Sequence, residues 1–452
     1  MESQDLSQRG NWGSKVAFVF AASGSAIGLG NIWRFPMVVG QNGGALFVLV
    51  YILAVAFIGF SVMLAELVIG RYSQKNPVGA FESIKPGSLW KLIGYFGILT
   101  AVCIFSYYAV IAGWSVGYLI KMASGSFKAD VTSELSDKIF TEFSSDPLQV
   151  ILYFLLMMGI TTYIVSKGIK GGIERWTKIL MPILFILIVF LSGRALTLPG
   201  AEEGISFYLK PDFSQLSGKL VLYALGQAFF SLSLGMGIMV TYGSYLSKTD
   251  NLVTSAGWVC FFDSLIAFLA GIIIFPTLFA IPGIAPTAGP GLVFKVLPLI
   301  FSKIPGGYLF GILFFCLFMI AALTSTISLL EVPVAYFVDE RRWSRKKAAI
   351  LVGFFVFLLG IPSALSSEGM AFFTKIDFMG KMDFIFANVS LAIGALLICI
   401  ILGYVWGVKN AAQEVQSGNP QFKLRFLWAF SIKFLSPVAI IVILYFIKTI
   451  AG

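Results

Sequence analysis

Long apolar runs divide this chain into segments that are each long enough to cross a lipid bilayer. About 20 apolar residues span the hydrocarbon core as an α-helix, and continuous runs of this length favour helices over the alternating pattern of a membrane β-strand. Eleven such segments are predicted, at 14–38, 44–70, 89–121, 148–166, 174–194, 219–247, 252–281, 306–338, 347–364, 378–407 and 425–450. The pattern therefore predicts an all-α membrane protein with eleven transmembrane helices.

Glycine interrupts the first and the sixth segments at corresponding places. The first carries Gly24, Gly28 and Gly30 just before Asn31, and the sixth has a second group within 226–237. Glycine inside a helix costs about 1 kcal/mol relative to alanine, so we expect both helices to unwind here. A lone pair such as Gly24 and Gly28 is also typical of helix packing, but the third glycine and the second interruption favour unwinding. Paired interruptions of this kind indicate a transporter's binding site.

The eleven segments form two halves of five helices with one helix added. We expect a short N-terminal segment over 1–13, a first repeat over 14–194, a second over 219–407 and a final helix over 425–450. Most Lys and Arg residues outside the spans fall on the side of the N-terminus, which places the N-terminus in the cytoplasm and the C-terminus outside. The Gly- and Pro-rich loop 282–307 would then form an outer lid or re-entrant segment.

Composition supports this class and excludes several functions. Apolar residues make up 58% of the chain and charged residues 12%, and the mean hydropathy is +0.90. The net charge of +10 reflects the membrane topology and gives no sign of nucleic-acid binding. Histidine is absent, which removes His-based triads, His proton relays and the usual zinc sites, and no nucleophile stands beside a base, so no enzyme is expected. The four cysteines lie in apolar spans, where packing without disulfides is expected.

Five ionisable residues lie within the predicted spans: Arg34, Glu66, Asp263, Glu331 and Asp383. Each costs about 2.5–3.5 kcal/mol to insert, and such residues usually mark function. We expect Glu66 and Glu331 to accept hydrogen bonds from unwound backbone. Arg34 and Asp383 lie toward the outer ends of their spans, where they form either a gate pair or unrelated interface charges. Asp263, a lone acid deep in its span, suggests a cation ligand or a proton site.

Hydroxyl groups concentrate in the middle of the eighth span, where Thr324, Ser325 and Thr326 follow Ala321 closely. Hydroxyl and carbonyl oxygens are hard ligands that suit a small alkali cation. The alternative is that these hydroxyls only bond to carbonyls of their own helix. Tyr107 and Tyr108, in the third span, are equally compatible with packing.

Gly172 lies just before the fifth span, at its cytoplasmic end, and Pro182 lies within the span. Glycine lowers helix propensity and proline removes an internal hydrogen bond. This combination predicts either an ordinary proline kink or a cytoplasmic end that unwinds reversibly and opens a water path from the inside.

The stretch Gly24-Ser-Ala-Ile-Gly-Leu-Gly-Asn-Ile-Trp-Arg-Phe-Pro36 resembles the signature of the neurotransmitter:sodium symporter family. Segments 66–72, 107–108, 227–237, 324–326 and 382–384 also fit, and the chain is most similar to bacterial members that end after eleven spans. The resemblance implies a LeuT-type fold of two inverted five-helix repeats with helices 1 and 6 broken mid-membrane. It also implies Na⁺-driven import across the bacterial inner membrane by alternating access.

The resemblance further implies two Na⁺ sites, one substrate site and two gates. The first Na⁺ site would use Ala26, Asn31, Ser231 and Asp263, together with the substrate carboxylate. The second would use Gly24, Ile27, Ala321, Thr324 and Ser325. The substrate would contact Ala26, Leu29, Gly30, Ile104, Tyr108, Phe230, Ser231, Ser233, Met236, Ser325 and Leu329. The outer gate would be Arg34 with Asp383, and the inner gate Arg9 with Asp339, with Trp12 packed nearby.

Three positions bear on the cargo. Relatives that carry amines without a carboxylate place an acid where this chain has Gly28, so an α-amino acid is implied, and the apolar wall suggests broad acceptance of apolar and aromatic L-amino acids. Chloride-dependent relatives carry Asn at position 263 and Ser at position 267, whereas this chain has Asp263 and Ala267. The resemblance thus implies chloride independence. Proton coupling through Asp263 and a receptor without flux remain the alternatives, and the oligomeric state is open.

Overall fold

The computed structural model describes residues 10–128, 131–281, 291–367 and 370–447, and all regular structure within them is helical. The first half contains α2 (Lys15–Ala26), η1 (Gly30–Arg34), α3 (Phe35–Gln41), α4 (Ala45–Ala54), η2 (Val55–Gly59), α5 (Phe60–Ser73), α6 (Pro77–Ile84), η3 (Leu89–Lys91), α7 (Leu92–Ala123), α8 (Ser133–Ser145), α9 (Pro147–Ser166), η4 (Ile169–Glu174) and α10 (Arg175–Ala195).

The second half contains α11 (Ala201–Leu209), η5 (Phe213–Gln215), α12 (Gly218–Ser231), α13 (Ile238–Gly243), α14 (Leu252–Phe279), η6 (Leu292–Val296), α15 (Leu297–Lys303), α16 (Gly307–Arg341), α17 (Arg345–Ala364), α18 (Ala371–Lys375), α19 (Phe378–Met382), η7 (Asp383–Ser390), α20 (Leu391–Ile400) and η8 (Ile401–Val405). The chain ends with α21 (Val408–Gly418), α22 (Arg425–Phe430), η9 (Ser431–Leu435) and α23 (Ser436–Tyr445).

The predicted spans are present. Within the described residues, nine helical stretches are long and apolar enough to cross a membrane, and α2 with the helix over 30–41 forms a tenth, bent by 53°. Helices α12 and α13, separated by the non-helical residues 232–237, make up the remaining predicted span. The prediction of an all-α protein with helices 1 and 6 broken is therefore confirmed.

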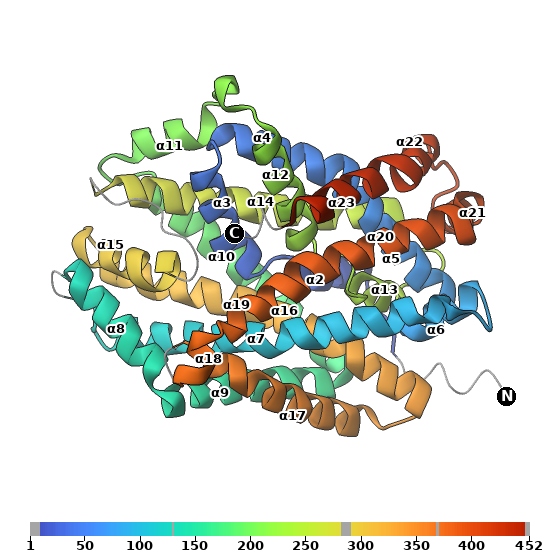
Figure 1. The fold of residues 1–452 in the computed structure, drawn as a ribbon, viewed down its shortest axis with the longest axis horizontal. Coiled ribbons are helices and arrows are strands. Elements are labelled where there is room, and N and C mark those ends of the chain that lie inside the picture. Colours follow the sequence, from blue (N-terminus) through green and yellow to red (C-terminus); the bar gives the residue numbers. More distant parts are fainter. Residues whose placement is uncertain (1–9, 129–130, 282–290, 368–369, 448–452) are drawn as a thin grey trace.

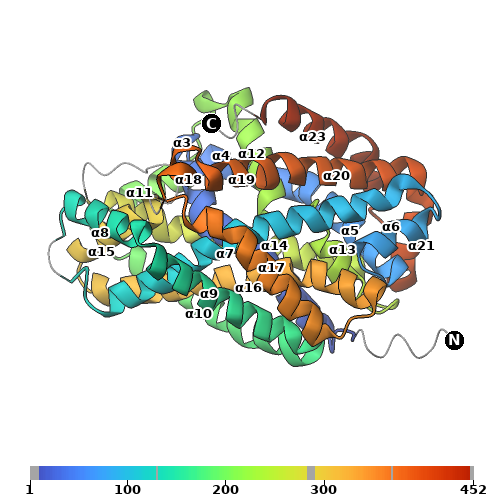
Figure 2. The ribbon, with the colours of Figure 1, turned by 60° about the horizontal axis from the view of Figure 1, so that its bottom comes forward.

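The molecule has two distinct ends. Helices α8 and α15 lie at one end, and α6, α21 and the first described residues of the chain lie at the other (Figures 1 and 2). We call these the vestibule face and the N-terminal face. The connections over 122–147 and 195–218 carry the short helices α8 and α11. In the predicted lid, η6 and α15 are described, whereas residues 282–290 lie outside the described part of the chain.

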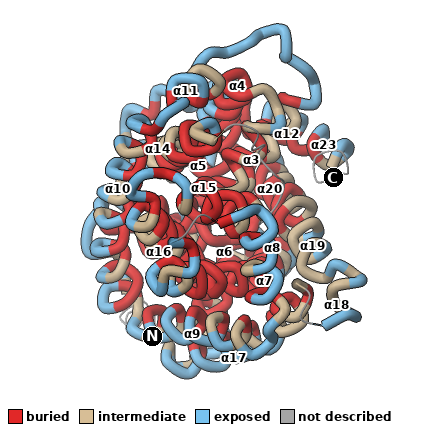
Figure 3. Tube along the Cα trace, turned by 90° about the vertical axis from the view of Figure 1, so that its left-hand side faces the viewer, coloured by how far each residue is buried: buried red, intermediate tan, exposed pale blue. Residues whose placement is uncertain are grey.

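Burial separates a packed centre from a ring of outer helices, as the view onto the vestibule face shows (Figure 3). Helices α7 and α16 pack against each other, and both are buried over most of their middle portions. The outer helices expose large apolar side chains, among them Leu152 on α9, Ile186 on α10, Phe354 on α17 and Val438 on α23. Apolar side chains on the outside and polar ones inside suit a protein that is surrounded by lipid.

The two breaks are held open by side chains. After α2 ends, the N–H of Gly28 donates to the side-chain oxygen of Asn31 at 3.0 Å, so it leaves the helical ladder. In the second break, Ser233, Gly235 and Gly237 adopt positive φ angles of 54°, 87° and 78°. Glu66 on α5 accepts a hydrogen bond from the Gly235 N–H at 2.7 Å, which is the role predicted for it. The backbone freed at each break is thus satisfied by buried polar side chains.

Candidate functional site

A small cavity of about 40 Å³ lies between the two breaks. It is lined by Ser25, Ala26, Gly28, Gly30, Ile104, Tyr108, Phe230, Ser231, Ser233, Met236, Ile238, Ser325, Ser328, Leu329 and Leu391. The structure therefore brings together ten of the eleven residues assigned to the substrate. The other one, Leu29, adjoins the cavity, because its N–H donates to the Tyr108 hydroxyl at 3.0 Å.

Two glycines leave the space that this cavity needs. A Cβ atom on Gly28 would lie 2.5 Å from both the Tyr108 hydroxyl and the Ser325 hydroxyl. A Cβ atom on Gly30 would lie 2.7 Å from the Phe230 ring. Real Cβ atoms do not approach other heavy atoms so closely, so glycine at these positions is a packing requirement. Backbone, hydroxyl and ring thus meet here at van der Waals contact.

Asp263 lies at the centre of a fully buried polar cluster. Its carboxylate accepts hydrogen bonds from the Asn31 amide at 2.7 Å and from the Ser231 hydroxyl at 2.8 and 3.0 Å. The Tyr51 hydroxyl on α4 donates to the same carboxylate at 3.1 Å. Sequence reasoning missed Tyr51, because a tyrosine inside an apolar run gives no signal that differs from packing.

The charge of Asp263 is left without a counter-charge from the protein. In the described ranges, no Lys or Arg forms an ion pair with it, and its three hydrogen-bonding partners are neutral. A buried carboxylate in this state carries a large desolvation penalty unless a cation joins it. The hydroxyl and carboxylate oxygens gathered here are ligands that a hard cation such as Na⁺ prefers, while Asn31 directs its NH₂ group to Asp263 and its oxygen to the Gly28 N–H. The chemistry of the cluster therefore fits a cation.

The second predicted cation cluster is also assembled. The Ser325 hydroxyl lies 3.3 Å from the Ile27 carbonyl, and the Thr324 hydroxyl lies 3.0 Å from the Ala321 carbonyl. A Cβ atom on Gly24 would meet the Thr324 Cβ at 3.2 Å, so α2 and α16 touch at this point. Thr324 also bonds to the Ile320 carbonyl of its own helix at 3.2 Å, which is the alternative role considered for these hydroxyls.

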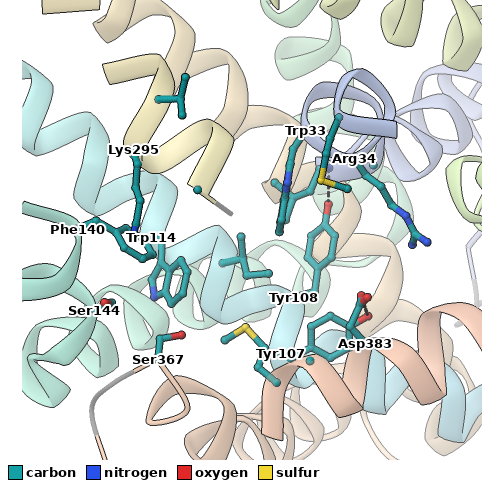
Figure 4. A pocket seen from close by; sticks show the side chains of 18 of the residues that line it. Trp33, Arg34, Tyr107, Tyr108, Trp114, Phe140, Ser144, Lys295, Ser367 and Asp383 are labelled. Carbon is teal, nitrogen blue, oxygen red and sulfur yellow. Dashed lines mark hydrogen bonds between the residues drawn. The ribbon is translucent and has the colours of Figure 1, made fainter. Parts of the chain in front are cut away.

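A second, larger cavity of about 1040 Å³ reaches the site from the vestibule face. Figure 4 shows Trp33, Arg34, Tyr108 and Asp383 on one side of it and Trp114, Phe140 and Lys295 on the other. Tyr108 and Phe230 line both cavities, so these two rings separate the small cavity from the large one.

Arg34 and Asp383 come from the expected places, but they do not pair with each other in this structure. The Arg34 guanidinium stacks over the Phe230 ring at 4.3 Å and donates to Asn388 at 2.6 Å. Asp383 accepts a hydrogen bond from Tyr107 at 3.0 Å. Both predicted gate residues thus line the large cavity near Tyr108 and Phe230, but Arg34 bonds to Asn388 and Asp383 bonds to Tyr107.

At the N-terminal face, Trp12 closes the space beneath the site. Its indole N–H donates to the Tyr242 carbonyl at 3.0 Å, and its ring packs edge-on against Tyr242 and Tyr245 at 5.3 and 6.2 Å. Asp339 accepts a hydrogen bond from the Asn76 N–H at 2.8 Å. Arg9, its predicted partner, lies outside the described residues.

Glu331 differs from its prediction. Among the described residues it accepts from the Tyr245 hydroxyl at 2.6 Å and forms an ion pair with Arg345, and not from the backbone of either break. The sequence showed that Glu331 is buried, but the Arg345 that reaches it comes from the next helix, α17. The buried carboxylate of Glu331 is therefore neutralised by the Arg345 guanidinium of α17.

The fifth span begins as η4, a π-helical turn that contains Gly172, and continues as α10, which contains Pro182. A Cβ atom on Gly172 would collide with the Ile164 carbonyl of α9. Glu174, at the end of η4, accepts a hydrogen bond from the Gly13 N–H at 2.8 Å. The start of this span is thus fastened to both α9 and the N-terminal segment.

If this turn unwinds to release Na⁺ to the N-terminal face, replacing Gly172 and Pro182 by alanine should slow that release roughly ten-fold, because both changes favour a continuous helix. Na⁺ efflux from loaded proteoliposomes measures the rate. Pro182→Ala alone is the cleaner variant, since Gly172→Ala meets the Ile164 carbonyl. Gly193→Ala is the control, because it lies at the opposite end of α10, away from η4, and a Cβ atom there has no neighbour within 4 Å among the described residues outside its own helix. Unchanged Na⁺ efflux in Pro182→Ala and in the double variant would show that Pro182 forms only an ordinary helix kink.

Comparison with known proteins agrees with the fold. The family model described as "Sodium:neurotransmitter symporter family" matches residues 9–130 and 127–451. The sodium-dependent transporter YhdH of Bacillus subtilis is 39% identical over 96% of this chain and 96% of its own length. A sodium-dependent transporter of Haemophilus influenzae is 40% identical over 96% of this chain and 97% of its own.

Among solved structures, MhsT in complex with L-phenylalanine is 44% identical to this chain, with a TM-score of 0.88 over 97% of this chain and 99% of MhsT. The two bacterial relatives are sodium-dependent transporters, and the matching family is one of symporters, not of enzymes. The signature around the first break, the two broken helices and the matched model together show that this chain belongs to the sodium:neurotransmitter symporter family, as a multi-pass, sodium-coupled transporter.

Proposed function

We propose that this sodium-coupled symporter imports apolar and aromatic L-amino acids and does not need chloride. The observation that carries the proposal is the small cavity between the breaks, in which polar groups meet an apolar wall formed by Ile104, Phe230, Met236 and Leu329. A zwitterion can bind with its charged groups at the breaks while an apolar side chain fills the rest. The relative MhsT was solved with L-phenylalanine, which supports the same class of cargo.

The cargo must bring its own carboxylate. Position 28 is glycine, and a side chain there would occupy the space between Tyr108 and Ser325. We assign the substrate carboxylate to the N–H groups of Leu29 and Gly30, next to the Tyr108 hydroxyl. Its amino group would meet carbonyls of Ala26, Phe230 and Ser231, with Ser233 beside them. The Leu29 N–H now bonds to Tyr108 at 3.0 Å, so a carboxylate would share or replace that bond.

Two Na⁺ ions would bind on either side of the first break. We assign the first to Ala26, Asn31, Ser231 and Asp263, with the substrate carboxylate as a further ligand. We assign the second to Gly24, Ile27, Ala321, Thr324 and Ser325. A substrate carboxylate that shares a metal ion couples the binding of cargo and ion, since each raises the affinity for the other.

Transport would proceed by alternating access, with the vestibule face outside and the N-terminus in the cytoplasm. The thin layer formed by Tyr108 and Phe230 would open first toward the vestibule, and Arg34 and Asp383 would close above it. On the inner side, Trp12 and the pair Arg9 and Asp339 would have to separate. The excess of basic residues on the N-terminal side supports this orientation.

A competition panel tests the cargo and the coupling ion together. Purified protein is incubated with radiolabelled leucine and each of the twenty amino acids, with Na⁺ and with K⁺ in its place. We expect apolar and aromatic L-amino acids to compete only in Na⁺, and uptake into proteoliposomes to follow an inward Na⁺ gradient. Binding that follows pH and ignores Na⁺ would instead favour a proton-coupled carrier, and binding without uptake would favour a receptor.

Chloride independence follows from Asp263 and Ala267, because a fixed carboxylate beside Na⁺ takes the place of the anion. Both residues are fully buried on α14 and lie one helical turn apart. Uptake should remain unchanged when gluconate replaces chloride on both sides of the membrane. Loss of uptake on that exchange would refute this part of the proposal.

A further inference from the structure

A pair of serine hydroxyls that the assignments above leave unused lies in the wall of the small cavity. Ser25 on α2 and Ser328 on α16 both line it, and their hydroxyl oxygens are 2.6 Å apart. Both residues are buried, with exposed fractions of 2% and 0%. A buried hydroxyl pair is costly unless its hydrogen bonds are used.

Both hydroxyl protons of this pair are donated within the protein, but one of the two oxygens can still accept a hydrogen bond. The Ser328 hydroxyl donates to the Ser325 carbonyl at 2.9 Å, so the proton between the two serines must come from Ser25. The Tyr242 hydroxyl also interacts with Ser328. Within the described residues no group donates to the Ser25 oxygen, and a hydroxyl oxygen has two lone pairs. The pair therefore offers the cavity an acceptor.

The position of the pair within the cavity determines how far a hydroxyl of the ligand must lie from its amino and carboxylate groups. Ser328 follows Ser325 by one turn toward Glu331, whose partner Tyr245 packs against Trp12, so the pair lies on the N-terminal side of the zwitterion groups. Ser25 likewise precedes Leu29 by about one turn of the first span. One turn corresponds to roughly 5 Å along a helix axis. A hydroxyl near the end of a long side chain reaches this depth, whereas a hydroxyl on the β-carbon stays beside the zwitterion.

We propose that Ser25 and Ser328 form a specificity subsite that accepts a hydrogen bond from the phenol group of tyrosine. The proposal rests on the amino-acid site proposed above and names a preference within it. Ile104, Ile238, Leu329 and Leu391 supply the apolar slot for the ring. Phenylalanine still binds, since the serines remain bonded to each other when no phenol is present. The expected preference is therefore the value of one hydrogen bond, about five-fold in affinity.

The test compares ratios of affinities in the full-length protein. Inhibition constants of tyrosine, phenylalanine, threonine and valine are measured against radiolabelled leucine in Na⁺, for wild type, Ser25→Ala and Ser328→Ala. We expect each variant to weaken tyrosine about five-fold relative to phenylalanine and to leave the ratio of threonine to valine unchanged. Ser23→Ala is the matched control, because this serine lies on α2 as Ser25 does, does not line the cavity and has a hydroxyl with no hydrogen-bond partner among the described residues.

Binding of phenylalanine shows that a variant is folded. The two serines lie on different helices, so if one variant does not fold, the other still tests the proposal. Equal weakening of tyrosine and phenylalanine would show that the pair only fastens α2 to α16 and would overturn the proposal. A shift in the ratio of threonine to valine, with none for tyrosine, would overturn it as well. If no amino acid competes in Na⁺ even for wild type, it is the proposed function that fails.

Discussion

Asp263→Asn should abolish Na⁺-dependent amino-acid binding at ordinary Na⁺ concentrations while leaving the protein folded. The carboxylate is fully buried, and in the described part of the chain only neutral groups bond to it. A cation beside it would lose its main charge partner, and removing one partner of a buried charge pair costs about 3–5 kcal/mol. We expect the half-saturating Na⁺ concentration to rise by at least about 100-fold. Binding of radiolabelled leucine over a Na⁺ titration measures the shift.

The structure also supplies the controls for this variant. Asparagine has the shape of aspartate, and the hydroxyls of Ser231 and Tyr51 can rotate to suit its amide. Glu142→Gln removes one negative charge from the exposed helix α8, where the side chain is 65% exposed, and should change nothing. The double variant Asp263→Asn with Ala267→Ser should regain binding only when chloride is present. An unchanged Na⁺ titration in Asp263→Asn would show that this carboxylate is not a sodium ligand.

Gly28→Ala should weaken substrate binding roughly 10- to 100-fold, because overpacking a close-packed site costs about 1–3 kcal/mol. The new methyl group would lie 2.5 Å from the hydroxyls of Tyr108 and Ser325. Ser325 can rotate away, but the Tyr108 ring has to move as a whole, and this breaks its 3.0 Å hydrogen bond with the Leu29 N–H. The loss therefore falls on the carboxylate end of the site, and the affinity of radiolabelled leucine in saturating Na⁺ measures it.

A matched glycine elsewhere separates this effect from a general change in helix propensity. Gly257 lies on α14, and a Cβ atom there has no neighbour within 4 Å among the described residues outside its own helix. Gly257→Ala should leave the affinity for leucine unchanged. Wild-type affinity in Gly28→Ala would mean that the substrate does not use the space between Tyr108 and Ser325, and the assignment of the cavity would have to be abandoned.

The fold could be predicted from the sequence because its signals are local. Apolar length marks each span, and the glycines at 24, 28 and 30 mark the first break within a single stretch of chain. The role of Glu66 was also accessible, since a buried acid in a lipid-surrounded helix needs donors and broken backbone supplies them.

The partners of the other buried charges could not be predicted, because they depend on how separate helices are rotated and spaced. Arg34 and Asp383 have the right charges for a pair, yet Asn388 and Tyr107 lie nearer to them. Glu331 is paired with Arg345 of the following helix. Tyr51, Ser25 and Ser328 gave no signal at all, because isolated hydroxyl residues in apolar runs look alike whether they face a cavity, a carboxylate or a neighbouring helix.

The hydrogen bonds at the first break have a mechanical consequence. The N–H groups of Gly28 and Leu29 bond to side chains, Asn31 and Tyr108, and not to carbonyls of α2. The joint between the two half-helices is therefore a pivot, and tilting α2 about it breaks no rung of either helical ladder. A bound molecule that bridges Leu29 and Ser325 would restrain this pivot, so binding and release of the substrate change how freely α2 can tilt.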